Sequence, residues 1–365
     1  MNSKRVIPFV LIFVIAGGTV SSQPALKDVF ENSFYVGTAL NRRQLMGADT
    51  ASIRLVEQHF NSITAENIMK WELVHPQPDK YLFEPADSLV AFGERNDMFI
   101  VGHTLVWHSQ TPKWVFEEVD REALLQRVKD HISTIVGRYK GRIHGWDVVN
   151  EAIEDDGSLR QSQWLNIIGE DYLEQAFEWA HKADPEAELY YNDYNMYKPG
   201  KVESVVRLVR KFQTKGIPIH GIGMQGHWGL DYPSLQELEA SLAAYSELGL
   251  DIMITELDLN ILPDAGQGQG ADVSQNYKLR EKLNPYPDGL PDAMQEKLTQ
   301  RYKELFVLLD KYRPSISRVT FWGVHDGISW RNNWPVRGRT AYPLLFDREL
   351  QPKPAFFAVI ETVSN

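Results

Sequence analysis

The sequence contains no cysteine among its 365 residues, and it carries less positive than negative charge. The lack of cysteine excludes a disulfide framework, a thiolate metal site and a lipid anchor attached through a cysteine. The 38 Lys and Arg against 49 Asp and Glu give a formal charge of -11. That excess of acid argues against nucleic acid or anionic lipid as a partner, so a neutral polymer fits better as substrate.

A long hydrophobic run is also missing. The apolar stretch from Val6 to Ala16 follows Lys4 and Arg5, and small residues suited to cleavage follow it near Ser22. A helix that spans a membrane needs about 20 apolar residues, which is more than this stretch supplies. The pattern therefore predicts a signal peptide over residues 1–22, export to the periplasm or the medium, and no membrane anchor after cleavage.

No Pro/Ser-rich linker, internal repeat or low-complexity tract divides residues 23–365, which predicts one domain. Eight segments rich in β-branched and aromatic residues alternate with segments of helical periodicity, such as 121–139, 201–216 and 294–312. The strand candidates are residues 33–40, 60–67, 98–107, 143–151, 188–195, 219–228, 251–259 and 319–327. This order predicts a single-domain α/β fold, a (β/α)8 barrel. The alternative is an open doubly wound sheet, but no G-x-G-x-x-G joins a strand to a helix.

One segment departs from this alternation. Residues 262–292, between the seventh predicted strand and its helix, are too rich in glycine and proline for regular structure. Long loops of this kind are uncommon and often functional. Two interpretations stay open: the loop overhangs the catalytic face of the barrel, or it is a solvated insertion without a role in chemistry.

Polar and aromatic side chains gather where the predicted strands end, and a barrel builds its active site at that face. In chain order they are Glu66, Asn67, Lys70, His103, Trp107, Asn150, Glu151, Asn192, Tyr194, Gln225, His227, Glu256, Asp258, Trp322 and Trp330. Each alone is compatible with a helix cap, an ion pair or core packing. Several ionisable groups at one barrel mouth instead indicate a catalytic pocket.

Two chemistries compete for this set. Metal-dependent hydrolysis would need clustered histidine and carboxylate ligands, yet there is no H-x-H on the first strand and no H-E-x-x-H. Glycoside hydrolysis needs two carboxylates, donors for hydroxyl groups and flat aromatic faces, all of which are present. Glu256 has the polar neighbours Asp258 and His227 and is the candidate nucleophile. Glu151 is the candidate acid, because a nearby negative Glu256 would raise its pKa.

Several motifs together resemble glycoside hydrolase family 10, the retaining endo-β-1,4-xylanases. They are WDVVNE at 146–151, ITELD at 254–258, HTLVWHSQTP at 103–112, TAEN with Lys70, GMQGHW at 223–228 and RNNWPVRGRTAYPLLFD near the C-terminus. The resemblance extends over nearly the whole chain after residue 22. It implies a (β/α)8 barrel that hydrolyses xylan, with no cofactor and no metal.

The resemblance also implies roles for individual residues. Glu151 becomes the general acid/base and Glu256 the nucleophile, supported by Asn150, which binds the sugar 2-hydroxyl, and by His227 and Asp258. The substrate-binding residues are then Glu66, Asn67, Lys70, His103, Trp107, Tyr194, Gln225, Trp322 and Trp330. Tyr194 is assigned to the leaving-group side.

Asn150 and Glu151 raise a geometric question, because neighbouring residues of a strand point to opposite faces. Both roles require the two side chains to reach one sugar, which predicts a bend or bulge at this point of the barrel rim. Two other functions stay open from the residues alone: hydrolysis of another β-linked glycan such as glucan or mannan, and carbohydrate binding without catalysis. The two carboxylates argue against the second, since a pure binder does not need them.

Overall fold

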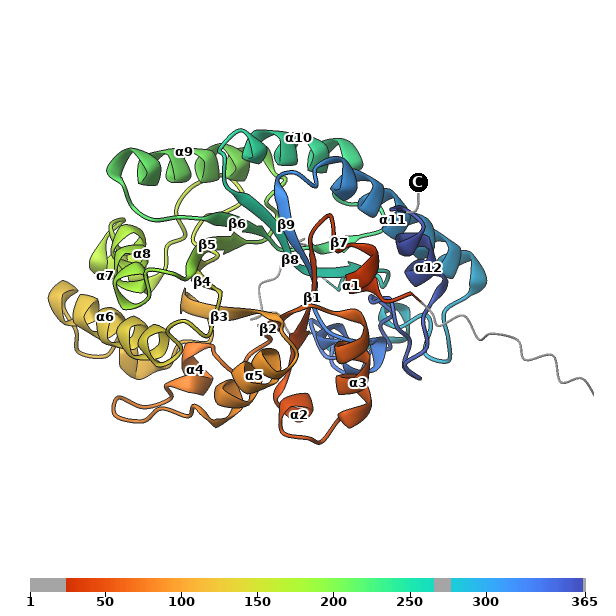
Figure 1. Cartoon of the computed structure of the whole chain (residues 1–365), viewed down its shortest axis with the longest axis horizontal. Coiled ribbons are helices and arrows are strands. Elements are labelled where there is room, and N and C mark those ends of the chain that lie inside the picture. Colours follow the sequence, from red (N-terminus) through yellow and green to blue (C-terminus); the bar gives the residue numbers. More distant parts are fainter. Residues whose placement is uncertain (1–23, 266–276, 364–365) are drawn as a thin grey trace, which may run out of the picture.

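The protein is described by a computed structural model over residues 24–265 and 277–363, and its centre is a ring of parallel strands (Figure 1). Within these residues the strands pair in the order β6, β5, β4, β3, β2, β1, β9, β8, and β6 also pairs with β8. That last pairing closes the sheet, so the predicted (β/α)8 barrel is confirmed. The predicted signal peptide, residues 1–22, lies outside the described residues.

Most strands lie within the segments predicted for them, but β7 and β8 end one residue after theirs and β9 begins three residues before its own. Their bounds are β1 Tyr35–Leu40, β2 Ser62–Ala65, β3 Phe99–Trp107, β4 Gly145–Asn150, β5 Glu188–Asp193, β6 Gly221–Met224, β7 His227–Gly229, β8 Asp251–Asn260 and β9 Ile316–Phe321. Every residue of β4 is buried, as expected for a parallel strand with side chains of the barrel on one side and helices on the other.

The sixth predicted strand is interrupted. It consists of β6 and β7, with Gln225 and Gly226 between them. A Cβ atom on Gly226 would lie 2.8 Å from the Cα atom of Leu257 in β8, so the backbone passes closer to β8 than any side chain allows.

Helices surround the barrel (Figure 1). The longer ones are α3 Thr50–His59, α5 Glu84–Arg95, α6 Arg121–Arg138, α8 Tyr172–Ala183, α9 Pro199–Lys215, α10 Leu235–Ser246 and α11 Asp292–Lys311. Shorter pieces are α1 Leu26–Val29, α2 Arg42–Leu45, α4 Trp71–Val74, α7 Gln163–Ile168 and α12 Pro354–Ile360, with 3-10 turns at Lys113–Val115, Glu281–Leu283, Asp326–Ile328 and Trp330–Asn332. None of the helices in the described ranges is long and apolar enough to cross a membrane.

Helix ends follow from local sequence. Asp120 accepts a hydrogen bond from the Ala123 N–H and so caps α6. Pro199 begins α9, where its missing N–H costs nothing, and Gly216 ends it with a φ of 69°. The helix therefore ends within the predicted segment 201–216.

The predicted loop 262–292 packs against the segment that follows β9. Tyr277 bridges Val336, and the Thr340 N–H donates to Asn284 Oδ1 at 2.8 Å. Contrary to the expectation of no regular structure, Glu281–Leu283 forms one 3-10 turn. Residues 266–276 of this loop lie outside the described residues.

The layer between the barrel and its helices depends on a glycine that makes room for an aromatic ring on the next strand. A Cβ atom on Gly102 of β3 would lie 2.1 Å from the Trp146 indole, which is fully buried in β4. We expect Gly102→Ala to lower the free energy of unfolding by about 1–3 kcal/mol, because the indole has no space to move into. Chemical denaturation measures the change.

Gly137 provides the matched control, because it lies on the exposed side of α6 and nothing lies within 4 Å of a Cβ atom there. Gly137→Ala should raise the free energy of unfolding by about 0.5–1 kcal/mol. Equal effects of the two substitutions would contradict this account of the core.

Candidate active site

A cavity of about 80 Å³ lies at the carboxyl ends of the strands. Its walls are formed by Glu66, Asn67, Lys70, His103, Trp107, Gln110, Asn150, Glu151, Gln225, His227, Glu256, Trp322 and Trp330. These are the predicted site residues without Asp258 and Tyr194, and with Gln110 added. Asp258 is fully buried directly behind His227, to which it is hydrogen-bonded.

Glu151 reaches this cavity because the chain turns sharply at the end of β4. The pairing of β4 with β5 shifts register between Asp147 and Val149, and Glu151 itself has a φ of 57°. Its Oε1 accepts a hydrogen bond from Gln225 Nε2 at 3.0 Å, and its Oε2 accepts one from Trp107 Nε1 at 2.7 Å. The predicted bulge at the rim is confirmed, and the carboxylate points into the barrel mouth.

The environment of Glu151 favours its protonated form. Burial is the largest cause, followed by the negative charge of Asp193, and together they raise the pKa of Glu151 from 4.5 to about 7 despite the hydrogen bonds from Gln225 and Trp107. Glu256 also raises this pKa, as predicted, but it contributes less than burial and Asp193. The charge of Asp193 was not foreseen from the sequence.

Glu256 lies in β8, where the pairing with β9 shifts register between Ile254 and Leu257. Its Oε1 accepts a hydrogen bond from Asn192 Nδ2 at 2.9 Å, and its Oε2 lies 3.0 Å from His227 Nε2. Burial alone would raise the pKa of Glu256, but the hydrogen bond and positive charge of His227, with smaller contributions from other cations, bring it below the ordinary value. The site therefore contains one carboxylate that stays ionised.

His227 is held between two acids. Its Nδ1 lies 3.0 Å from Asp258 Oδ1, opposite the contact with Glu256. Burial lowers the pKa of His227, yet the charges and hydrogen bonds of Asp258 and Glu256 outweigh burial and raise it to about 9. At neutral pH the imidazolium thus donates to both carboxylates.

Asp258 stays ionised because cations and donors surround it. Arg331 Nε and Nη2 donate to its Oδ1 at 2.7 and 2.6 Å, and Trp330 Nε1 donates to its Oδ2 at 2.6 Å. Burial would raise the pKa of Asp258, but the charges of Arg331 and His227 lower it below the ordinary value. Arg331 was not predicted as a site residue, although it directly follows Trp330.

Three amides connect the two glutamates. Asn192 Nδ2 donates to both Glu256 and Asn150 Oδ1, each at 2.9 Å. Gln225 Nε2 donates to both Glu151 and Asn150 Oδ1, at 3.0 and 3.2 Å. Because Asn150 Oδ1 accepts both bonds, its NH2 group is the part left to meet a ligand. Asn192 was noted at a strand end but given no role.

A second wall carries a buried cation. Lys70 Nζ donates to Asn67 Oδ1 at 2.8 Å and to Gln110 Oε1 at 3.1 Å, and it lies 4.8 Å from the centre of the Trp107 ring. Burial lowers the pKa of Lys70, which the nearby glutamates partly offset. Gln110 lies in the HTLVWHSQTP motif but was not predicted as a site residue. It follows the end of the strand, so the alternation of side-chain direction along a strand does not indicate where its side chain points.

Aromatic and imidazole side chains form the remaining wall. His103 Nδ1 lies 2.8 Å from Asp147 Oδ2, which fixes the ring. Trp322 meets His103 edge-on, with ring centres 5.4 Å apart. The indole of Trp330 stacks on Trp334 with centres 4.5 Å apart. Trp334 and Asp147 were not predicted, since each acts through a neighbour.

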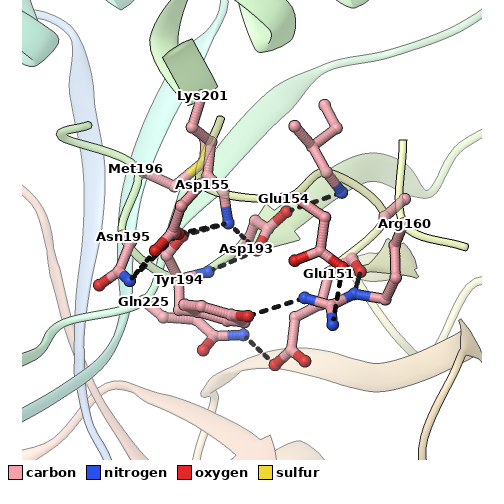
Figure 2. Close-up of polar contacts among 12 residues, drawn as sticks. Glu151, Glu154, Asp155, Arg160, Asp193, Tyr194, Asn195, Met196, Lys201 and Gln225 are labelled. Atoms are coloured by element: carbon pink, nitrogen blue, oxygen red, sulfur yellow. Dashed lines mark hydrogen bonds and ion pairs between the residues drawn. The ribbon is translucent and has the colours of Figure 1, made fainter. Parts of the chain in front are cut away.

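Tyr194 lies beside the cavity and does not line it. Its hydroxyl accepts a hydrogen bond from Arg160 Nη2 at 2.7 Å, and Arg160 Nε donates to the backbone carbonyl of Glu151 at 2.8 Å (Figure 2). The assignment of Tyr194 to the leaving-group side stays a prediction. Among residues 24–265 and 277–363, no group of three or more His, Asp or Glu side chains is placed to hold a metal ion.

A closed (β/α)8 barrel whose mouth holds Glu151 with a raised pKa and Glu256 with a lowered pKa, between amide donors and indoles, defines a glycoside hydrolase. The chain belongs to glycosyl hydrolase family 10, whose family model matches residues 25–362.

Relatives of known structure and activity agree with this family. Endo-1,4-beta-xylanase A of Xylanibacter ruminicola is 48% identical over 356 residues, which cover 96% of each chain. A family 10 endoxylanase retrieved from a sugarcane soil metagenome superposes with a TM-score of 0.90 at 47% identity, over 92% of this chain and 99% of the other. The intracellular xylanase of Thermoanaerobacterium saccharolyticum, solved as a mutant with xylotriose, gives a TM-score of 0.80 at 36% identity, over 93% and 99%.

The opposite protonation states predict two different titrations. In ¹³C NMR with carboxyl-labelled glutamate, we expect one resonance with a pKa near 7 that disappears in Glu151→Gln. The resonance lost in Glu256→Gln should titrate below pH 4.5, because His227 stabilises the ionised form. Titration of both lost resonances in the same range would contradict the assignment of charges.

Proposed function

We propose that the protein is a retaining endo-β-1,4-xylanase that cleaves internal bonds of xylan by double displacement. The observation that carries this proposal is the pair of buried glutamates at one cavity, Glu151 with a raised and Glu256 with a lowered pKa. A nucleophile must be ionised and a general acid must hold a proton, so the environment separates the two roles. The xylanase names of the relatives and the bound xylotriose support xylan as substrate.

In the first step, a Glu256 carboxylate oxygen attacks the anomeric carbon. The bond from that carbon to the leaving oxygen breaks, and the leaving oxygen takes the proton from Glu151. The products are a shortened chain with a new hydroxyl group and a sugar esterified to Glu256. The hydrogen bonds from His227 and Asn192 hold the attacking carboxylate in place.

In the second step, Glu151, now ionised, takes a proton from a water molecule whose oxygen attacks the same carbon. The ester bond breaks and Glu256 leaves as a carboxylate, so the sugar keeps its original β configuration. The NH2 group of Asn150 is the proposed donor to the sugar 2-hydroxyl. Substrate contacts of the next sugar are assigned to Glu66, Asn67 and Lys70, which line the same cavity.

The proposal includes export, which rests on the N-terminal sequence alone: Lys4 and Arg5, the apolar stretch after them, and the small residues near Ser22. One of the relatives is described as intracellular, so family membership does not decide the compartment. Cell fractionation, with N-terminal sequencing of the recovered protein, tests this part. A cytosolic chain that retains residues 1–22 would overturn it.

A comparison of polysaccharides tests the substrate. The protein should release reducing sugar from xylan at a rate at least tenfold above that from mannan or cellulose, and the first product should be the β-anomer by ¹H NMR. An α-anomer would exclude the retaining mechanism. Higher activity on mannan or cellulose would instead indicate a hydrolase of another glycan. Binding of a polysaccharide without hydrolysis would indicate a carbohydrate-binding barrel that lacks catalysis.

Variants of the two glutamates test their roles. Glu256→Ala should reduce kcat on xylan by about 10⁴-fold or more, because no covalent intermediate forms. Glu151→Ala should reduce kcat by about 10²–10⁴-fold on xylan but much less on an aryl xylobioside with a good leaving group, which needs little protonation. A loss in Glu151→Ala that does not depend on the leaving group would contradict its role as acid.

A further inference from the structure

The backbone around Glu151 is held in an unusual conformation. A φ of 57° is left-handed, and a residue with a Cβ atom adopts it only where the surroundings impose it. Five consecutive backbone groups are hydrogen-bonded here, one of them the Ala152 carbonyl, which accepts from the Arg160 N–H at 2.9 Å. The Glu151 N–H donates to the carbonyl of Asn192 at 2.9 Å, and the Glu151 carbonyl accepts from Arg160 Nε at 2.8 Å.

The next two N–H groups are bound by side chains of β5. The Ala152 N–H donates to the Tyr191 hydroxyl at 3.2 Å, and the Ile153 N–H donates to Asp193 Oδ2 at 3.3 Å. The Tyr191 hydroxyl in turn donates to the same Asp193 oxygen at 2.5 Å. Asp193 is therefore the acceptor on which the turn after Glu151 depends.

Asp193 is itself one half of a buried ion pair (Figure 2). Lys201 Nζ donates to Asp193 Oδ1 at 2.9 Å, and the side chains of both residues are 0% exposed. Lys201 Nζ also donates to the Tyr194 carbonyl at 2.9 Å and lies 3.6 Å from Asp155 Oδ1. A buried carboxylate is costly unless it is paired in this way.

We propose that Asp193, charge-paired with Lys201, is a positioning residue for the acid/base: it fixes the peptide after Glu151 and keeps a proton on the Glu151 carboxyl by placing a fixed negative charge behind it. A neutral acceptor such as asparagine or serine would suffice to hold a backbone N–H. A charge adds a second effect, because it opposes ionisation of a neighbouring carboxyl group through a medium of low dielectric constant.

Other charges also face Glu151, and the proposal concerns the contribution of Asp193 among them. Asp193 and Glu256 oppose its ionisation. Within residues 24–265 and 277–363, charged or titratable groups that also interact with Glu151 are those of Lys70, His108, Arg160 and Tyr194. Asp193 differs from Glu256 in one respect: it takes no part in the proposed covalent chemistry, so its charge persists through both steps. It therefore also keeps Glu151 a good base in the second step.

The inference rests on the proposed function, since it assigns Asp193 to the acid of that reaction. The test is the pH profile of kcat/KM on an aryl xylobioside with a poor leaving group. In the wild type, the basic limb of the profile reports the pKa of the free acid, near 7 for Glu151. Asp193→Asn should move this limb to lower pH by about 0.5–1 unit, which is a further loss of roughly 3–10-fold at pH 8.

Asp326→Asn is the matched control. Asp326 is also fully buried, also accepts from a lysine, Lys353 Nζ at 2.9 Å, and also accepts from a backbone N–H, that of Leu344. It is expected to cost comparable stability without moving the basic limb. A basic limb that stays in place in folded Asp193→Asn, or that moves equally in Asp326→Asn, would overturn the proposal.

Two further variants keep the test decisive if Asp193→Asn does not fold. The double variant Asp193→Asn with Lys201→Met leaves no unpaired buried cation, and its basic limb should also move to lower pH.

Tyr191→Phe keeps both charges but removes the acceptor for the Ala152 N–H, so kcat should fall about tenfold with the basic limb unchanged. If the basic limb moves in Tyr191→Phe, the shift is not specific to the charge of Asp193. If Tyr191→Phe keeps full activity, the hydrogen bonds to the peptide after Glu151 do not position the acid. Either result would contradict the proposal.

Failure of this inference and failure of the proposed function have different signatures. If the wild type does not hydrolyse xylan or the aryl xylobioside, the proposed function is wrong. If the wild type is active, and Glu151→Ala shows the dependence on the leaving group, an unmoved limb in the Asp193 variants rejects only the role of Asp193.

Discussion

The imidazolium of His227 between Glu256 and Asp258 is the interaction on which the site depends. Two buried glutamates at one cavity would both tend to take up protons, because burial opposes ionisation of each. A cation shared between Glu256 and Asp258 removes this symmetry, and Arg331 keeps Asp258 ionised so that the imidazole keeps its proton. Among the described residues, the hydrogen bonds to the Glu151 carboxyl come from the neutral side chains of Trp107 and Gln225, and its pKa stays raised.

Irregular strand ends bring these groups together. Register shifts occur in β3 after His103, in β4 after Asp147 and in β8 after Ile254, each just before a residue that lines the cavity. Regular alternation would send part of this set toward the helices. A bulge changes the direction of a side chain while the remainder of the strand stays paired in the barrel. The regular part of each strand therefore builds the barrel, and the irregular part directs side chains into the cavity.

Much of this could be predicted from the sequence, for identifiable reasons. The strands were recognisable because they are short apolar runs at regular spacing. Glu151, next to Asn150, and Glu256, two residues before Asp258, were recognisable because these polar residues interrupt such runs near their ends. Gln110 and Arg331 were missed because they lie in irregular segments. Lys201 looks like an ordinary surface cation of a helix, and only the tertiary structure places it against Asp193. The split of the sixth strand also depends on a contact between strands that are adjacent only in the closed barrel.

Gly226, where that strand divides, has a consequence for how this chain tolerates mutation. It has no side chain and no assigned role in the reaction, yet it lies between Gln225 and His227, and its carbonyl accepts the Asp258 N–H at 3.1 Å. Any side chain here would push against the backbone of β8 beside the nucleophile. In a scan of all substitutions scored by activity, those at Gly226 would therefore abolish activity as often as those at a catalytic residue. A ranking of positions by loss of activity alone would then list Gly226 as catalytic, although the cause is the lack of space beside β8.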